Sequence, residues 1–515
     1  MMRRWRTVSK AWVVLVVGTL AFIASACSSS DSDSSQAVFE PGPCPSSKAS
    51  IPELENALCG VLVVPENRTK SNGRTIRLPV AIIPSVSQPP QGSPIVHLTG
   101  GPGGDALSEA PVLVASGLNQ DRDLILMDQR GDLDTEPELT CPEVDEFSIE
   151  VIGLPYGADT TRELHVAATK LCHDRLVAEG IDLGAYNTTE NAADFADLRK
   201  VLGIEEWNVY GFSYGTNLAL TLMRDHPEGI RSVIIDSVVP PSVASLGWTW
   251  TNANEGINNI FRACTDQPAC NDKYGDLAAT FAGLVQELEA NPLITTGTYS
   301  PEVPPVTVVL DGGALVNWLA AIPQPLLDVS SIPAAIDALA HGNPAPIANS
   351  RSFFTDPAGI GLFGHGLAFG VFCSEWIPFE PESQILAQGR LAFPTYPDSV
   401  LSQSPQLPFM TEDCAVWNVP KAPSSARDIT ASDIPTLIIT GSFDGRTSPQ
   451  WGAYAAETLP NSTNIIIPGI GHWVTPQSEC AQMVIASFLD TPDAPDTGCV
   501  AGLTPPPFDT EELTP

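Results

Sequence analysis

Basic residues are scarce in this sequence of 515 residues. Only 25 lysines and arginines stand against 60 aspartates and glutamates, and the formal net charge is −35. A field of this sign repels a phosphate backbone, so we expect no nucleic-acid partner. It can attract cationic ligands, although solubility is the plainer interpretation of most of the charge. Charged residues make up 17% of the chain and apolar residues 43%, which excludes a disordered polyelectrolyte and allows a sizeable core.

Several ligand-binding motifs are also missing. The sequence contains no C-x-x-C pair, which argues against a zinc knuckle or a thioredoxin-type site. It contains no G-K-[ST] phosphate loop and no G-x-G-x-x-G that opens a dinucleotide-binding unit. No internal repeat of fixed period is visible. We therefore expect neither a cofactor nor a metal ion.

The first 27 residues have the pattern of an export signal. A basic start is followed by the apolar run AWVVLVVGTLAFIA, which is short for a membrane span. The tetrapeptide A-S-A-C resembles a bacterial lipobox, with Ala24 where leucine is usual, and predicts that Cys27 becomes the lipidated first residue. Residues 28–43 would then be a flexible tether. The alternative is ordinary cleavage beside an idle cysteine. Without residues 1–27, 21 basic residues face 60 acidic ones, a net charge near −39.

The eleven cysteines are an odd number, which requires an explanation in an exported protein. Setting Cys27 aside leaves ten, enough for five disulfides in an oxidising compartment. Sequential pairing is the simplest connectivity, but sequence alone does not fix it. The ten candidates are Cys44, Cys59, Cys141, Cys172, Cys264, Cys270, Cys373, Cys414, Cys480 and Cys499.

Short β-branched runs alternate with helical patterns through residues 44–240, which predicts an α/β fold with a mostly parallel sheet covered by helices. Residues 241–428 break this rhythm. They are rich in Pro, Asn, Gly and Trp, and their helical patterns have few strands among them. We interpret them as a mainly helical cap inserted before the last strands, which resume at IPTLIITGS within residues 429–500. Residues 501–515 are a C-terminal tail.

The stretch VYGFSYGT places Ser213 between a strand and a helix, within a G-x-S-x-G pattern. This pattern is typical of the nucleophile elbow, a strained turn that lifts a serine hydroxyl above the sheet. The turn also presents the backbone N–H of Tyr214 at a helix N-terminus, where developing negative charge is favoured. The pentapeptide alone is weak evidence, because any glycine-rich turn can match it.

A nucleophilic serine needs a base and an acid that orients the base. The loop LIITGSFDGRTSP places Asp444 just after a predicted strand, and IIIPGIGHWV places His472 after the next. All three side chains would lie at the carboxyl ends of strands, where open α/β sheets form their sites. Individually, Asp444 is interpretable as a turn aspartate and His472 as a helix-capping residue.

A second donor for an oxyanion is expected from the loop HLTGGPGG, which follows the run PIV. Its glycines let the main chain approach a substrate, and we expect Gly101 or a neighbour to act together with Tyr214.

Five motifs together, GGPGG, DQRG, YGFSYGT, GSFDGRTSP and GHW, carry a family resemblance. The sequence resembles the α/β-hydrolase serine peptidases related to prolyl aminopeptidase, above all the actinobacterial tripeptidyl aminopeptidases and their mycobacterial cell-envelope lipoprotein members. The resemblance implies an α/β-hydrolase fold, with Ser213 as nucleophile, Asp444 as orienting acid and His472 as base. It implies a substrate that is a peptide with a free N-terminus or a small ester. The sequence departs from the family at Asp132 to Thr135, where a second glycine and a serine are usual.

The resemblance also implies an acidic residue near the end of the cap that binds the substrate's ammonium. Glu375 in FGVFCSEW is the candidate, with a surface glutamate as the alternative. Thr447 would support Asp444 or cap the helix that begins at Pro449.

Three functions remain open at this stage. The first is an exported, lipid-anchored serine aminopeptidase that releases tripeptides or other short peptides from free N-termini. The second is a carboxylesterase or lipase with the same catalytic residues, since both reactions use the same machinery. GGPGG in place of an HGGG-type loop favours the peptidase. The third is a non-catalytic envelope-binding lipoprotein, against which the presence of Ser, Asp and His argues. The oligomeric state is not readable from the sequence.

Overall fold

The computed structural model describes residues 37–45, 51–71, 73–300, 303–321, 328–355, 360–381 and 383–511. The predicted export signal and Cys27 lie outside these ranges. Within them, no helix combines the length and the apolar composition that a bilayer span requires.

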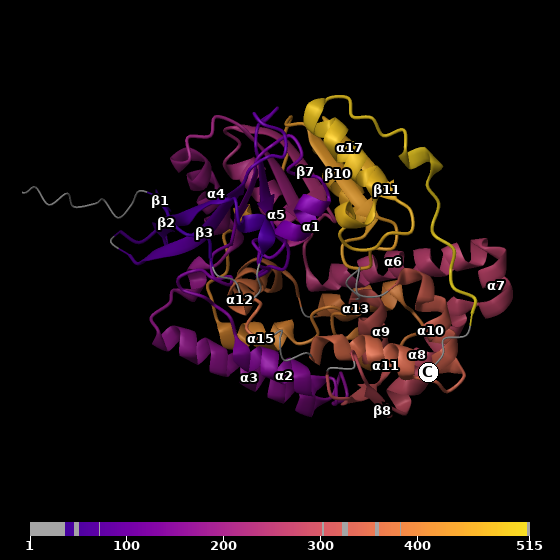
Figure 1. Cartoon of the computed structure of the whole chain (residues 1–515). Helices are drawn as coiled ribbons and strands as arrows, with labels where there is room; N and C mark the ends of the chain where they lie inside the picture. The colour runs from indigo at the N-terminus through magenta and orange to yellow at the C-terminus, as the bar shows by residue number, and fades with distance from the viewer. Residues whose placement is uncertain are drawn as a thin grey trace, which may run out of the picture.

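A nine-stranded sheet forms the centre of the α/β core, in the order β1-β2-β3-β5-β4-β6-β7-β10-β11 (Figure 1). The first three strands and the β3–β5 pair are antiparallel, and the strands from β5 to β11 in this order pair in parallel. The predicted mostly parallel sheet is confirmed. The strands are β1 (Val38–Pro41), β2 (Leu58–Pro65), β3 (Thr75–Ile83), β4 (Ile95–Leu98), β5 (Leu124–Met127), β6 (Trp207–Phe212), β7 (Ile230–Asp236), β10 (Thr436–Gly441) and β11 (Ser462–Ile467).

Helices cover both faces of this sheet, and on each face an apolar cluster fills the space between the sheet and its helices. On one face α4, α5 and α16 pack on side chains such as Val209 and Ile438. On the other face α1 and α17 pack on Tyr210 and Ile439. Successive strand residues point to opposite faces, so burial on both sides produces the continuous apolar runs of the sequence. These helices are α1 (Ala110–Ala115), α4 (Thr188–Val201), α5 (Tyr214–Asp225), α16 (Pro449–Ala456) and α17 (Glu479–Asp490).

One part of the predicted tether differs from the sequence interpretation. Within residues 28–43, Val38–Pro41 forms β1 and pairs antiparallel with β2, and residues 28–36 lie outside the described residues. An uncovered β2 would expose a row of unpaired backbone groups, and β1 satisfies them.

The cap lies below the sheet in Figure 1 and is mainly helical, with one β8–β9 hairpin. Its elements are α6 (Leu246–Asp266), α7 (Pro268–Tyr274), α8 (Leu277–Ala290), β8 (Leu293–Gly297), β9 (Val306–Leu310), α9 (Gly312–Ala321), α10 (Ile332–Ala340), α11 (Ala345–Arg351), α12 (His365–Val371), the π-helical segment η6 (Phe372–Trp376), α13 (Ser383–Ala392), α14 (Asp398–Leu401) and α15 (Met410–Trp417).

Two helices from the first part of the chain join this layer. α2 (Pro142–Val151) and α3 (Asp159–Ala178) follow β5 in sequence, yet α3 packs against α15 of the cap (Figure 1). The bond between His165 Nε2 and Asp413 Oδ2, 2.9 Å long, links the two helices. Two separate excursions of the chain therefore build the layer that covers the sheet's carboxyl edge.

Five disulfides join the ten remaining cysteines in sequential order, the simplest pairing. They are Cys44–Cys59, Cys141–Cys172, Cys264–Cys270, Cys373–Cys414 and Cys480–Cys499. Such a density of disulfides indicates a chain that folds outside the cytoplasm.

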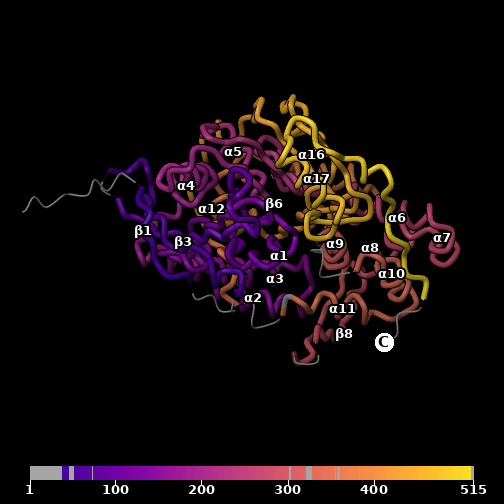
Figure 2. Tube along the Cα trace, turned by 45° about the horizontal axis from the view of Figure 1, so that its top comes forward, coloured from indigo at the N-terminus to yellow at the C-terminus, as the bar shows by residue number. Residues whose placement is uncertain are grey.

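The C-terminal segment crosses from the core to the cap, as Figure 2 shows along α6 and α10. Gln267 Nε2 donates to the carbonyl of Pro506 over 2.9 Å, and the Tyr274 hydroxyl donates to the carbonyl of Asp509 over 2.7 Å. The ring of Phe508 stacks on Phe443, beside Asp444, with ring centroids 6.3 Å apart. Residues 506–509, within the predicted tail, thus form a strap between the two layers.

Candidate active site

Ser213 occupies the sharp turn between β6 and α5. Its φ of +54° and ψ of −122° are unusual for a residue with a side chain. A Cβ on Gly211 would lie 2.4 Å from the carbonyl oxygen of Gly215, and one on Gly215 would lie 1.9 Å from that of Leu98. These approaches explain why both outer positions of G-x-S-x-G are glycine. The turn is the predicted elbow.

The side chains of Ser213, His472 and Asp444 form a continuous hydrogen-bonded series. His472 Nε2 lies 3.0 Å from Ser213 Oγ, and His472 Nδ1 lies 2.9 Å from Asp444 Oδ2. His472 is 6% exposed and Asp444 1%. Three segments far apart in the sequence, at the ends of β6, β10 and β11, thus meet at one edge of the sheet. In this arrangement the imidazole can accept the hydroxyl proton while the carboxylate fixes its orientation.

Asp444 is held by its own loop. Its Oδ1 accepts hydrogen bonds from the backbone N–H groups of Arg446, over 2.8 Å, and Thr447, over 2.9 Å. The Thr447 hydroxyl donates to Oδ2 over 2.7 Å. Burial acts to raise the pKa of Asp444, but the neighbouring His472 and these hydrogen bonds outweigh it and lower the pKa. Asp444 is therefore ionised when the imidazole accepts a proton. Thr447 supports Asp444, the first of its two predicted roles.

A buried carboxylate that the sequence analysis missed connects the serine to the histidine. Asp236 ends β7, and its carbonyl accepts from Ser213 N–H over 3.0 Å. Its carboxylate accepts from the backbone N–H groups of Val474, over 3.0 Å, and Thr475, over 2.8 Å. Asp236 thus ties the elbow to the loop that carries His472. An acidic residue at the end of an apolar run was the available signal.

The GGPGG loop lies beside the elbow. A Cβ on Gly100 would lie 3.0 Å from the Cβ of Ser213. Gly101 has a φ of +113°, which favours glycine, and its peptide bond to Pro102 is cis. The cap contacts this loop, because Gly364 N–H donates to the carbonyl of Gly103 over 2.8 Å. Tyr214 is the first residue of α5, where backbone N–H groups have no partner within the helix.

The DQRG motif supports this loop from the neighbouring strand β5. Gln129 Nε2 donates to the carbonyl of Thr99 over 2.9 Å, and Asn191 Nδ2 donates to Gln129 Oε1 over the same distance. Asp128 Oδ1 accepts from the N–H groups of Ala106 and Leu107, beyond the glycines. The motif thus holds both ends of the glycine-rich segment.

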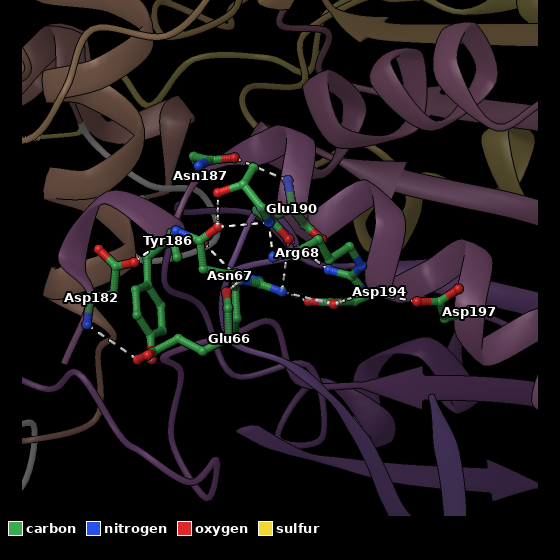
Figure 3. Close-up of polar contacts among 12 residues, drawn as sticks. Glu66, Asn67, Arg68, Asp182, Tyr186, Asn187, Glu190, Asp194 and Asp197 are labelled. Carbon is green, nitrogen blue, oxygen red and sulfur yellow. Dashed lines mark hydrogen bonds and ion pairs between the residues drawn. The ribbon is translucent and has the colours of Figure 1, made fainter. Parts of the chain in front are cut away.

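Arg130 of the same motif is fully buried and anchors it to α4. Its Nε and Nη2 each donate to Asp194 over 2.8 Å. Arg68 reinforces Asp194 from the other side and also pairs with Glu190 and Asp197 (Figure 3). Because two guanidinium groups neutralise this buried carboxylate, the network is stable without a ligand. In the described residues, no group of three or more His, Cys, Asp or Glu is arranged to hold a metal ion.

Asp132, where the sequence departs from the pattern of the resemblance, places a carboxyl group between the DQRG motif and Gly364 of the cap. Asp132 is fully buried, and its Oδ2 accepts from the N–H of Gln129 over 3.2 Å. A Cβ on Gly364 would lie 2.6 Å from its Oδ1. Burial, with Asp105 next in effect, raises the pKa of Asp132 well above its ordinary value. Burial thus favours the protonated form of this carboxyl group.

Glu375 is 5% exposed and lies in η6. Its Oε1 accepts from Thr188 N–H and its Oε2 from the Thr188 hydroxyl, both over 2.7 Å. Thr188 Oγ1 lies 3.0 Å from the hydroxyl of Tyr214. Each oxygen of Glu375 thus accepts one hydrogen bond from Thr188 and keeps a further acceptor position. Binding of the substrate amine stays a prediction.

A cavity of about 510 Å³ lies within the cap layer, with Gly101 on its wall. It is lined by residues of α2, α3, α9, α11, α12 and α15. Many of the lining side chains are aromatic, among them Phe147, Tyr156, Trp318, Phe369 and Phe409. Arg446, whose backbone N–H binds Asp444, is also part of the wall. The cavity thus extends from the candidate oxyanion loop into an apolar interior.

Two family models match the chain. The model described as "alpha/beta hydrolase fold" matches residues 93–280, and the model described as "TAP-like protein" matches residues 403–501. The first spans the glycine loop and Ser213, and the second spans Asp444 and His472.

The chain is also similar to curated proteins that carry peptidase names. The chain is 26% identical over 252 residues to "Serine protease Hip1" of Mycobacterium tuberculosis, covering 44% of this chain and 45% of that protein. It is 28% identical over 238 residues to "Tripeptidyl aminopeptidase" of Streptomyces coelicolor, covering 44% and 43%. The match thus spans less than half the length of either relative. Among solved structures, a proline iminopeptidase of Mycobacterium smegmatis is 17% identical, covers 81% of this chain and 96% of its own, and has a TM-score of 0.38.

Proposed function

This chain belongs to the α/β-hydrolases and its C-terminal part is TAP-like, and from that membership we propose that it is an exported serine aminopeptidase. We propose that it releases short peptides, tripeptides among them, from free N-termini. The observation that carries the proposal is the unbroken series Ser213–His472–Asp444 at the carboxyl edge of the sheet. The two relatives named above carry protease and aminopeptidase names, which supports the choice of peptide substrates.

In the proposed mechanism, Ser213 Oγ attacks the scissile carbonyl carbon while its proton passes to His472 Nε2. Asp444 stabilises the imidazolium, and the N–H groups of Gly101 and Tyr214 bind the oxyanion. His472 then gives the proton to the leaving nitrogen, the C–N bond breaks, and an acyl-enzyme remains on Ser213. A water molecule attacks the acyl-enzyme as its proton passes to His472. The acyl–oxygen bond breaks, and the proton returns to Ser213.

A kinetic comparison tests the nucleophile. Ser213→Ala is expected to abolish hydrolysis of peptide arylamides, and His472→Ala to lose a comparable rate, since such residues act as a unit. Ser116→Ala is the matched control, because among the described residues its hydroxyl donates to the carbonyl of Val112 in the same segment of chain. Activity of Ser213→Ala within a few-fold of the wild type would reject Ser213 as nucleophile.

A carboxylesterase is the second candidate, and the apolar cavity is the observation that favours it. A hydrophobic chamber beside the glycine loop suits the acyl chain of an ester as well as peptide side chains. A panel of aminoacyl-, dipeptidyl- and tripeptidyl-arylamides beside short and long acyl esters separates the two. Preference for esters or N-acetylated peptides over peptides with a free N-terminus would replace the aminopeptidase with the esterase.

Glu375 remains our proposed contact for the substrate's ammonium. Glu375→Gln should then impair peptides with a free N-terminus by roughly 10- to 150-fold and spare N-acetylated peptides and esters. Equal loss on both groups of substrates would instead assign Glu375 to the positioning of Tyr214 through Thr188.

We further propose that residues 1–27 direct export and that Cys27 carries a lipid that anchors the protein at the outer face of the membrane. The five disulfides support an extracytoplasmic location. Cells fed an alkyne-labelled fatty acid should incorporate it into the wild type and not into Cys27→Ala. Equal incorporation into both proteins would reject Cys27 as the lipidated residue.

A further inference from the structure

The walls of the cap cavity carry more positive than negative charge, which is unusual in this protein. The whole chain has 25 basic and 60 acidic residues, yet Arg351 and Arg446 both line the cavity. Asp413 is the carboxylate among the lining residues. Both carboxylate oxygens of Asp413 already have hydrogen-bond partners, His165 at 2.9 Å and the Thr169 hydroxyl at 2.8 Å.

Arg351, at the last turn of α11, has neutral hydrogen-bond partners among the described residues. Its Nη1 donates to the carbonyl of Ala314 over 2.8 Å and to Asn317 Oδ1 over 3.4 Å. Its Nε is buried without a hydrogen-bond partner in the described part of the chain. No carboxylate of the described residues forms an ion pair with it within 4.0 Å. Burial lowers the pKa of this guanidinium. A buried cation that no described carboxylate contacts is costly in an apolar chamber, and an anionic ligand would lower that cost.

Asp311 acts electrostatically on Arg351, but its oxygens have other hydrogen-bond partners. Oδ2 accepts from Tyr156 N–H over 2.5 Å, and Oδ1 accepts from Ala314 N–H over 2.7 Å. Burial raises the pKa of Asp311 above its ordinary value. Asp311 therefore organises the start of α9 and leaves Arg351 without a direct ionic contact.

The two arginines mark different parts of the cavity. The backbone of Arg446 binds Asp444, so it lies at the catalytic side together with Gly101. Arg351 binds α9 residues and sits beside Tyr156 and Trp318 in the aromatic interior. A substrate acyl group that enters past Gly101 therefore meets the wall that contains Arg446 first and reaches Arg351 among the aromatic side chains farther in.

We propose that this cavity binds the acyl side of the substrate and selects a carboxylate within it, with Arg351 as the group that recognises the carboxylate. This rests on the proposed function, with the nucleophile at Ser213. For a peptide, the selected substrate carries a glutamate or aspartate among large apolar residues on the N-terminal side of the cleaved bond. For an ester, it is the monoester of a dicarboxylic acid.

The first test scans Glu, Gln and Lys through the three residues before the arylamide in an otherwise apolar series. The wild type should prefer Glu over Gln at one position by roughly 10- to 150-fold in kcat/KM, the range expected of a charge-assisted hydrogen bond. Arg351→Gln should abolish this preference while the Gln peptides react as before. The matched control Arg390→Gln removes an exposed cap arginine that pairs with Asp398, and should keep the preference. A preference that survives in Arg351→Gln, or its absence from the wild type, overturns the proposal.

A second test needs neither turnover nor a variant. Calorimetry on the wild type should detect binding of 6-phenylhexanoate at least tenfold tighter than of 6-phenylhexanamide. Equal binding of the two would overturn the carboxylate site. Fluorophosphonate labelling of Ser213 in the same samples reports separately on the nucleophile, so failure of the catalytic proposal and failure of the carboxylate site are distinguishable.

Discussion

At the scale of single residues, the candidate site depends on buried groups that receive hydrogen bonds from the backbone. Asp444 and Asp236 each accept from two backbone N–H groups of a single loop, and each fixes a segment that carries or supports His472. A carboxylate in such a position fixes the geometry of the catalytic side chains without contacting the substrate. Removing such a carboxylate leaves buried N–H donors without an acceptor, which lowers the free energy of unfolding more than the loss of an exposed contact does.

Asp236→Ala tests this view. It leaves the N–H groups of Val474 and Thr475 without their acceptor, so we expect a loss of about 3 kcal/mol or more in the free energy of unfolding. We also expect His472 to shift, which should slow fluorophosphonate labelling of Ser213 by roughly tenfold or more. Asp236→Asn keeps one acceptor oxygen, so its free energy of unfolding and its labelling rate should lie between those of the wild type and Asp236→Ala. Labelling at the wild-type rate in Asp236→Ala would show that the connection does not position the histidine.

Glu375 predicts a pH dependence of stability. Burial raises its pKa to about 7 in the folded chain, above the ordinary value of 4.5. Between these values the folded state holds a proton that the unfolded state has lost, so this group makes stability fall as pH rises. The free energy of unfolding of Glu375→Gln should therefore improve relative to the wild type by about 3 kcal/mol between pH 4.5 and pH 7. Denaturant titrations with disulfides intact measure this difference. A constant difference across that range would contradict the assignment.

At the scale of elements, close backbone approach fixes where β4, β6 and α5 meet. Gly215 at the start of α5 touches the carbonyl of Leu98 at the end of β4, and the next residues of that strand lead into the oxyanion loop. The elbow and the loop therefore cannot separate without opening the sheet.

Gly215→Ala is expected to place a Cβ 1.9 Å from the Leu98 oxygen and to cost about 3 kcal/mol or more in stability. Gly283→Ala, within α8, is the matched control, since its Cβ would meet nothing within 4 Å. The control should gain up to about 1 kcal/mol from helix propensity alone. Thermal unfolding of both variants checks the pair. Equal effects of the two substitutions would contradict the argument from close approach.

The C-terminal strap makes a separate prediction. Phe508 is 6% exposed and packs on Phe443, the residue before Asp444. Phe508→Ala should lower the free energy of unfolding by about 3 kcal/mol, as expected for a buried ring. It should also raise protease sensitivity at the contacts with α6 and α7. Unchanged stability would mean that the strap follows the fold without supporting it.

The elements also show what a single sequence can predict. Ser213, Asp444 and His472 were predictable because each follows a strand within a short motif, and parallel strands bring their carboxyl ends to one edge. The partners of Glu375 and Asp236 were not, since Thr188 lies 187 residues from Glu375 and Thr475 lies 239 residues from Asp236. The strand β1 was missed because edge pairing leaves no apolar alternation in four residues.

At the scale of the whole molecule, an α/β core supplies the reactive groups and a helical cap, built from two excursions of the chain, supplies the chamber above them. Disulfides fix segments of both layers, Cys480–Cys499 in the core and Cys373–Cys414 in the cap. The chain as a whole is acidic, whereas two arginines line the cap cavity, and our proposal for Arg351 places the recognition of substrate charge inside the cap.

The central claim is that Ser213 becomes acylated by substrate, and trapping the acyl-enzyme tests it most directly. The protein is mixed with a tripeptide p-nitrophenyl ester, quenched in acid within the first turnovers, and analysed by intact-mass measurement and peptide mapping. The account predicts a mass increase of one tripeptidyl group on the peptide that contains Ser213, and none in Ser213→Ala. Rapid product release with no acyl group on Ser213, or an acyl group on another residue, would contradict it.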